Sequence, residues 1–160
     1  MFAGRYEHSI DAKNRLMIPA RFRDVLAKES DRNLYVTVDV FDGEKFLAAY
    51  PSTAWAERMR EDEALARKDP KIALYVRKVS WDAEIVKPDK QSRLVLSDRL
   101  IGAAGLGREV VLVGQGARME VWDAARWRAV DARATERLAN LQSQTYGRPD
   151  LSVKIEKPGK

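Results

Sequence analysis

The sequence predicts an α+β protein built from two tandem half-units, each with the element order β-α-β-β-α. One motif, Asp-x-x-x-Arg, occurs at Asp11–Arg15 and again 78 positions later at Asp89–Arg93. The runs after each copy alternate in the same order between helical and strand patterns of apolar residues. The 160 residues are 45% apolar and 33% charged, which is typical of a folded globular chain. A repeated unit therefore organises the fold, and we divide it into residues 1–79 and 80–146.

The elements of the first half-unit follow from apolar periodicity and from turn residues. We predict a strand, a short helix, two strands and a long helix, in that order, over residues 5–10, 21–26, 34–40, 46–50 and 52–68. Pro19 suits the first turn of the short helix, and Ser52 is a natural N-cap for the long one. Asp69-Pro70 should break or kink the long helix, and a further helical stretch should run toward Val79.

The second half-unit repeats this order over residues 81–87, 98–101, 109–113, 119–122 and 124–144. Ser97 and Asp123 are natural N-caps of its two helices. The glycines at 102, 105 and 107 should end the short helix, because glycine accepts the left-handed conformation common at helix ends. Residues 147–160 lack apolar periodicity, so we expect a loose, mildly basic tail.

Composition favours some classes of function and argues against others. The formal net charge is +5, which favours polyanionic partners such as nucleic acid. The excess is spread out, since residues 1–80 carry 15 basic and 13 acidic side chains and residues 81–160 carry 14 and 11. There are no cysteines, which fits a reducing compartment. We expect no signal peptide, because the basic-then-apolar layout is missing, and no membrane partner, because no apolar run is long enough.

The Asp-x-x-x-Arg motif forms a polar connection of about five residues between apolar runs in both copies. Asn14 tolerates the left-handed conformation and suits a tight hairpin there. Ser92 suits it less, so the second turn should be more open or slightly strained. One interpretation is purely structural, with Asp and Arg paired across the turn; such exposed pairs add little stability.

The other interpretation is that each turn projects basic groups toward nucleic acid. A guanidinium matches a phosphate or a guanine edge with two parallel hydrogen bonds. Lys13 and Lys90 would add phosphate contacts in both copies. Two related turns on one pseudo-symmetric unit could follow a groove of the duplex.

An enzyme has the least support among the classes of protein considered. His8 is the single histidine, and one histidine among scattered carboxylates makes neither a catalytic set nor a metal site. The glycines at 102, 105 and 107 follow a predicted helix instead of opening one, so they do not form a phosphate-binding loop. We therefore expect no catalysis, no metal, no cofactor and no small-molecule substrate.

The motifs taken together resemble the MraZ family. The resemblance begins with Phe2-x-Gly4 and the run from Asp11 to Arg23, and it includes the second motif 78 positions later. It extends through residues 111–115 and 119–122 and covers about residues 1–145. One departure is Asn14, where the family usually has glycine; asparagine keeps the turn possible.

The resemblance implies a swapped-hairpin fold of the SpoVT-AbrB type, with a β-barrel and packed helices. It also implies ring-shaped homo-oligomers that bind direct repeats of double-stranded DNA in their own promoter. Such proteins regulate transcription of the division and cell-wall gene cluster, and they are cytoplasmic and nucleoid-associated. The family's DNA-binding arginines fall on Arg15, with Lys13 beside it, and on Arg93. The full set of DNA-binding candidates, with neighbours added from charge and position, is Asp11, Lys13, Asn14, Arg15, Lys90, Arg93, Arg5 and Arg21.

Two alternatives stay open at this point. An antitoxin of the same fold would need a disordered acidic or apolar arm, whereas this chain has a second half-unit and a short basic tail. In a protein-interaction scaffold, the two turns would hold subunits together instead of holding DNA.

Overall fold

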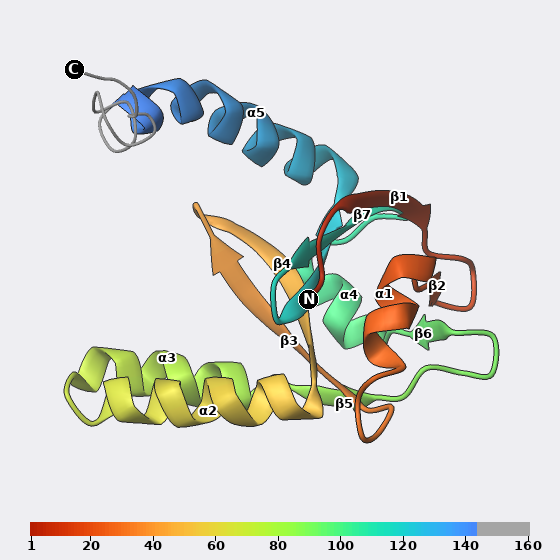
Figure 1. Cartoon of the computed structure of the whole chain (residues 1–160), viewed down its shortest axis with the longest axis horizontal. Helices are drawn as coiled ribbons and strands as arrows, with labels where there is room; N and C mark the ends of the chain where they lie inside the picture. Colours follow the sequence, from red (N-terminus) through yellow and green to blue (C-terminus); the bar gives the residue numbers. More distant parts are fainter. Residues whose placement is uncertain (144–160) are drawn as a thin grey trace, which may run out of the picture. The chain divides into compact units, whose positions relative to one another are not determined.

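The computed structural model describes residues 1–143, and the predicted tail at 147–160 lies outside them. The chain divides into two compact units. The first spans Met1–Ala124 and contains every strand described. The second begins at Ala125 and contains almost all of α5 (Ala124–Leu141). Figure 1 shows these elements in sequence colours.

The predicted order of elements is confirmed in the first half of the chain. It contains β1 (Arg5–Ser9), β2 (Arg15–Met17), α1 (Ala20–Leu26), β3 (Leu34–Phe41), β4 (Glu44–Pro51), α2 (Ser52–Ala66) and α3 (Pro70–Trp81). The break at Asp69-Pro70 is also confirmed, because the Asp69 side chain accepts a bond from the Lys71 backbone N–H and caps α3. Ser52 is not the N-cap of α2, since the helix already begins at Ser52 and its hydroxyl donates to Asp31 instead.

The second half repeats the order without a counterpart of α3. It contains β5 (Glu84–Val86), β6 (Arg93–Val95), α4 (Asp98–Ala104), β7 (Glu109–Gln115), β8 (Arg118–Asp123) and α5. Its strands β5, β7 and β8 are shorter than β1, β3 and β4. Ser97 caps α4 as predicted, accepting from the Leu100 backbone N–H. Two expectations were wrong in detail. Trp81 ends α3 instead of opening a strand, and α4 runs through Gly102 to the left-handed Gly105.

The two halves exchange strands within one sheet. The six-stranded sheet has the order β1-β7-β8-β4-β3-β5. The first strand of each half therefore pairs with the third strand of the other half: β1 pairs with β7, and β5 pairs with β3. Interchanging the equivalent strands of the two halves reverses this order and leaves it otherwise unchanged. A pseudo-two-fold axis therefore passes between β4 and β8, and the predicted α+β fold with exchanged hairpins is confirmed.

The remaining two strands, β2 and β6, form a separate antiparallel ribbon. Leu16 and Leu94 lie opposite each other in this ribbon and are fully buried. Because side chains alternate across a strand, a slip of one residue would expose both leucines. The buried pair therefore fixes the register of the ribbon and so fixes which residues face outward.

The hydrophobic core of the first unit lies between the sheet and the short helices. Phe22 of α1 is 1% exposed and makes edge-to-face contacts with two other rings. Its ring centroid lies 5.4 Å from that of Phe2 and 5.2 Å from that of Tyr6. The N-terminal segment passes close to β7, where Gly114 donates to the Gly4 carbonyl at 2.8 Å. A Cβ at Gly114 would lie 2.2 Å from the Ala3 nitrogen, so only glycine allows this approach. The Phe2-x-Gly4 segment and Gly114, both within the resemblance described above, therefore pack directly against each other.

Candidate nucleic-acid interface

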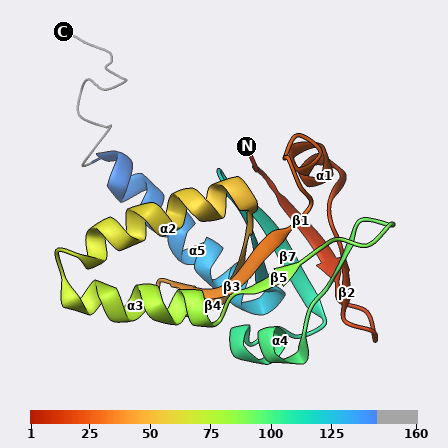
Figure 2. The same ribbon diagram turned by 90° about the horizontal axis from the view of Figure 1, so that it is seen from below.

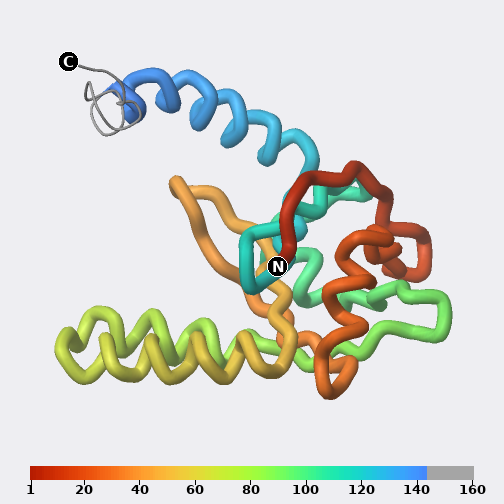
Figure 3. Tube along the Cα trace, viewed as in Figure 1, coloured from red at the N-terminus to blue at the C-terminus, as the bar shows by residue number. Residues whose placement is uncertain are grey.

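The two Asp-x-x-x-Arg turns lie at the same end of the first unit. Each turn leads into one strand of the β2–β6 ribbon. Figures 2 and 3 show the two turns projecting at the end opposite to the α2–α3 hairpin, the first in red and the second in green. The fold therefore brings together two motifs that are 78 residues apart in the sequence.

The first turn is closed by hydrogen bonds to the Asp11 carboxylate. Its Oδ1 accepts from the backbone N–H groups of Lys13 and Arg15, both at 2.9 Å, and its Oδ2 accepts from Arg15 Nε at 2.6 Å. The Arg15 backbone N–H, the Arg15 side chain and the Lys13 N–H lower the pKa of Asp11 to about 2. Asp11 is therefore ionised at neutral pH and holds both the backbone and the guanidinium of its motif.

The second turn reproduces this geometry. Asp89 Oδ1 accepts from the Gln91 and Arg93 backbone N–H groups at 2.8 and 3.0 Å, and Oδ2 accepts from Arg93 Nε at 2.8 Å. The Arg93 backbone and side chain lower the pKa of Asp89 below its usual value. The structural interpretation of the motif, an aspartate and an arginine paired across the turn, is thus confirmed in both copies.

The pairing leaves the recognition edge of each guanidinium available. Asp11 and Asp89 bind the Nε–H, while the edge that carries Nη1 and Nη2 is the one that can donate two parallel bonds to a guanine or a phosphate. The side chains of Arg15 and Arg93 are 32% and 25% exposed. The carboxylate therefore orients the arginine and does not use up its capacity for recognition.

Both turns need a left-handed residue directly before the arginine. Asn14 has φ +62° and Ser92 has φ +60°. The two turns therefore share one backbone conformation, and the second is not more open than the first. Serine lacks the tolerance of asparagine for this conformation, so the expected strain at Ser92 is present.

Backbone hydrogen bonds link the turns across the pseudo-two-fold axis. The Ile18 N–H donates to the Ser92 carbonyl at 3.0 Å, and the Leu96 N–H donates to the Asn14 carbonyl at 2.9 Å. These two bonds are equivalent under the 78-residue offset. Each turn is hydrogen-bonded to the residue that follows the strand of the other turn, so the two turns form one platform.

The first turn has further contacts from the second half of the chain. Arg108 Nη1 donates to the Asp11 carbonyl oxygen at 2.7 Å. Asn14 Nδ2 donates to Asp98 Oδ1 of α4 at 2.8 Å. These contacts fix the tip of the first turn, where the exposed Lys13 lies.

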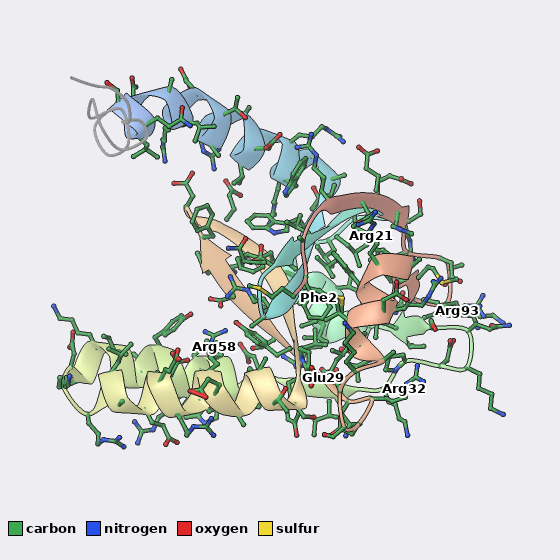
Figure 4. The ribbon with its side chains drawn as sticks, viewed as in Figure 1. Phe2, Arg21, Glu29, Arg32, Arg58 and Arg93 are labelled. Atoms are coloured by element: carbon green, nitrogen blue, oxygen red, sulfur yellow. The ribbon has the colours of Figure 1, made fainter. Side chains whose placement is uncertain are left out.

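The structure brings together most of the candidate residues predicted from the sequence. Six of them belong to the two turns: Asp11, Lys13, Asn14, Arg15, Lys90 and Arg93. Arg5 lies at the start of β1, at the far end of that strand from the first turn, and Arg21 lies on α1 beside Met1 and Ala3. Figure 4 shows Arg93 at the turns and Arg21 apart from it on α1.

Sequence reasoning missed four residues at this platform. Arg108 and Asp98 touch the first turn but lie in the other half of the chain. Met17 and Val95 are apolar side chains on the outer face of the ribbon, 38% and 52% exposed. Their alternation with buried Leu16 and Leu94 was visible in the sequence, but the pairing of the two strands was not.

Comparison with known proteins gives the family of this chain. The chain matches the protein family described as "MraZ protein, putative antitoxin-like" over residues 1–76 and 81–148. It belongs to the MraZ family. The chain is 41% identical to the transcriptional regulator MraZ of Acidithiobacillus ferrooxidans over 131 residues, which cover 81% of this chain and 87% of that protein.

Other MraZ relatives are similar over a larger share of their length. The transcriptional regulator MraZ of Corynebacterium diphtheriae is 33% identical, covering 92% of this chain and 98% of that protein. The one from Nitratidesulfovibrio vulgaris is 37% identical, covering 87% and 94%. The family consists of transcriptional regulators and not of enzymes. Among residues 1–143, no helix is long and apolar enough to cross a membrane, and no cluster of side chains could hold a metal ion.

Proposed function

We propose that this MraZ protein binds double-stranded DNA in its own promoter through the platform formed by its two Asp-x-x-x-Arg turns. Arg15 and Lys13 make most of the specific contact, and Lys90 and Arg93 contribute less. Asp11 and Asn14 shape the first turn, and Arg5 on β1 and Arg21 on α1 add phosphate contacts away from the turns. The observation that carries the proposal is the pair of guanidinium groups that are held by their Nε atoms on one ribbon.

The proposal extends to assembly and to the regulated genes. Several copies form a ring whose turns meet direct repeats, and the protein regulates the division and cell-wall gene cluster from the cytoplasmic nucleoid. The half-units of residues 1–79 and 80–146 act as one DNA-binding unit. A chain of net charge +5 with one platform would bind weakly, and repetition of the platform along a repeated site raises the effective affinity.

The test is a titration of the full chain onto the promoter upstream of its own gene and onto a scrambled duplex of equal length, at two salt concentrations. Binding should prefer the promoter and weaken steeply with salt. Arg15→Ala should weaken promoter binding by about 1–3 kcal/mol, because a bidentate contact to a base is lost.

Arg77→Ala is the matched control. It removes the same charge from an exposed position of α3. Figure 1 shows the α2–α3 hairpin at the other end of the unit from the turns. The affinity of Arg77→Ala for the promoter should match that of the unmodified protein. Equal binding by Arg15→Ala and Arg77→Ala would contradict the proposal. A change in oligomer mass with Arg15→Ala, without a change in DNA affinity, would favour the scaffold instead.

A further inference from the structure

The outer face of the β2–β6 ribbon carries two features that the proposed function leaves unexplained. Side chains that alternate with buried Leu16 and Leu94 point away from the core. They are Arg15, Met17, Arg93 and Val95. Two of these four are apolar and exposed, which is unusual on a face otherwise suited to a polyanion.

The strand register places one apolar side chain beside each arginine. Arg15 lies directly opposite Val95, and Arg93 lies directly opposite Met17. Side chains directly opposite in an antiparallel pair have Cβ atoms about 4.5–5.5 Å apart. Each guanidinium therefore has an apolar neighbour on the same face, and the two pairs are equivalent under the pseudo-symmetry.

The Met17 side chain is also held in place. Arg23 of α1 donates to the Met17 sulfur at 3.9 Å and to the Ile18 carbonyl at 2.9 Å. Val95 is β-branched, and such side chains have few rotamers. Two apolar side chains held at fixed distances from two oriented arginines can discriminate between bases. Mobile apolar side chains would only add apolar contact area without base preference.

We infer that Met17 and Val95 are specificity-determining residues that contact thymine methyl groups in the major groove. This inference rests on the proposed function. A two-stranded ribbon fits the major groove, where thymine presents its 5-methyl group and guanine presents O6 and N7. Each arginine with its apolar neighbour would then read guanine next to thymine. The basic turns at both ends of the ribbon favour DNA as the occupant of this apolar face, since Lys13 and Lys90 are exposed there.

The test replaces thymine by uracil in the promoter duplex, which removes the methyl group and keeps every hydrogen-bonding group. All thymines are replaced first, and then one position at a time. The unmodified full chain should bind the uracil duplex more weakly, by about fourfold for each contacted methyl. Single replacements should locate the loss at positions adjacent to guanine.

The double variant Met17→Ala/Val95→Ala assigns the contact to these residues. It should bind the thymine and uracil duplexes with equal affinity, while it still prefers the promoter to the scrambled sequence through its arginines. Val40→Ala is the matched control, because Val40 is 54% exposed on β3 and is outside the ribbon. Val40→Ala should keep the full difference between the two duplexes.

The remaining outcomes separate this inference from the proposed function. If the unmodified chain prefers its promoter but binds thymine and uracil duplexes equally, the inference is overturned and the function stands. The inference also fails if the double variant loses as much affinity on uracil as the unmodified chain. If the double variant alters the oligomer mass and the unmodified chain binds the two duplexes equally, the apolar pair is a contact between copies. Without any preference for the promoter, both the function and the inference fail.

Discussion

The turns and the α2–α3 hairpin are both held by arginine–aspartate pairs, but the two regions use them differently. In the first turn, Arg15 and Asp11 have side chains that are 32% and 40% exposed. At the base of the hairpin, Arg58 of α2 and Asp39 of β3 are 13% and 8% exposed. The first pair lies at the surface and includes an arginine of the proposed DNA contact. The second is largely buried and joins α2 to β3; Figure 4 labels its arginine, Arg58.

The buried region is a network instead of a single pair. Arg58 donates to Asp39 at 3.0 Å, to Asp62 at 3.0 Å and to the Tyr75 hydroxyl at 2.9 Å. The Tyr75 hydroxyl donates in turn to Asp39 at 2.7 Å. Burial and the bond to Asp39 raise the pKa of Tyr75 to about 12, so it stays protonated as the donor. One network of hydrogen bonds therefore joins α2, α3 and β3.

Burial decides what each pair can do. Exposed ion pairs contribute little to stability, because water solvates both partners in the unfolded chain and in the folded chain. A buried charge that loses its partner keeps the free-energy cost of desolvation but loses the electrostatic attraction that offset it. The turns therefore use the pair to orient a guanidinium, and the hairpin uses it to hold elements together.

The largest effect should come from Arg58→Ala. Asp39 would remain buried without its ionic partner, so the free energy of unfolding should fall by about 3–5 kcal/mol. Urea denaturation followed by circular dichroism measures this change. Arg15→Ala is the matched comparison, because it makes the same substitution in the exposed pair, and its free energy of unfolding should stay close to that of the unmodified protein. Similar losses in the two variants would remove the distinction between the regions.

Sequence periodicity and capping residues were sufficient to predict most of the elements. The strands at 34–40 and 46–50 appear as β3 and β4, and the break at Asp69-Pro70 appears as predicted, because these patterns are local. Local signals also misled at Ser52, where a serine suited to capping lies inside the helix and bonds to a loop.

Contacts between distant segments could not be predicted in the same way. The pairing of β2 with β6 depends on burying Leu16 against Leu94, and no local pattern says which strand is the partner. The same limit hid Arg108, whose bond to the first turn spans 97 residues of sequence. The Arg58 network was missed because Asp39 of β3 and Tyr75 of α3 reach Arg58 only through the tertiary fold. Asp62 is four residues from Arg58 on α2, and that spacing alone does not show that Arg58 is buried.

A smaller effect should distinguish the two turns from each other. Ser92→Gly should stabilise the protein by about 0.5–1 kcal/mol, since glycine relieves the left-handed strain and loses part of that gain to chain entropy. Asn14→Gly should give no such gain, because asparagine tolerates φ +62° and its side chain donates to Asp98. Thermal unfolding of the two variants side by side measures the difference. Equal gains would mean that the Asn14–Asp98 bond adds nothing.

The smallest effect should be the dependence of the first turn on pH. The folded pKa of Asp11 is about 2, below the value of 3.8 for an unperturbed aspartate. A depressed pKa stabilises the fold fully above the unfolded value, and this stabilisation is lost as the pH falls through the folded value. The difference in free energy of unfolding between the unmodified protein and Asp11→Asn should therefore be constant near neutrality and shrink from about pH 4 to about pH 2. Carboxyl NMR should give an Asp11 midpoint near the lower end of that window. A midpoint at the ordinary value would show that the backbone N–H groups of Lys13 and Arg15 do not hold this carboxylate in solution, and the orientation of Arg15 would then need another cause.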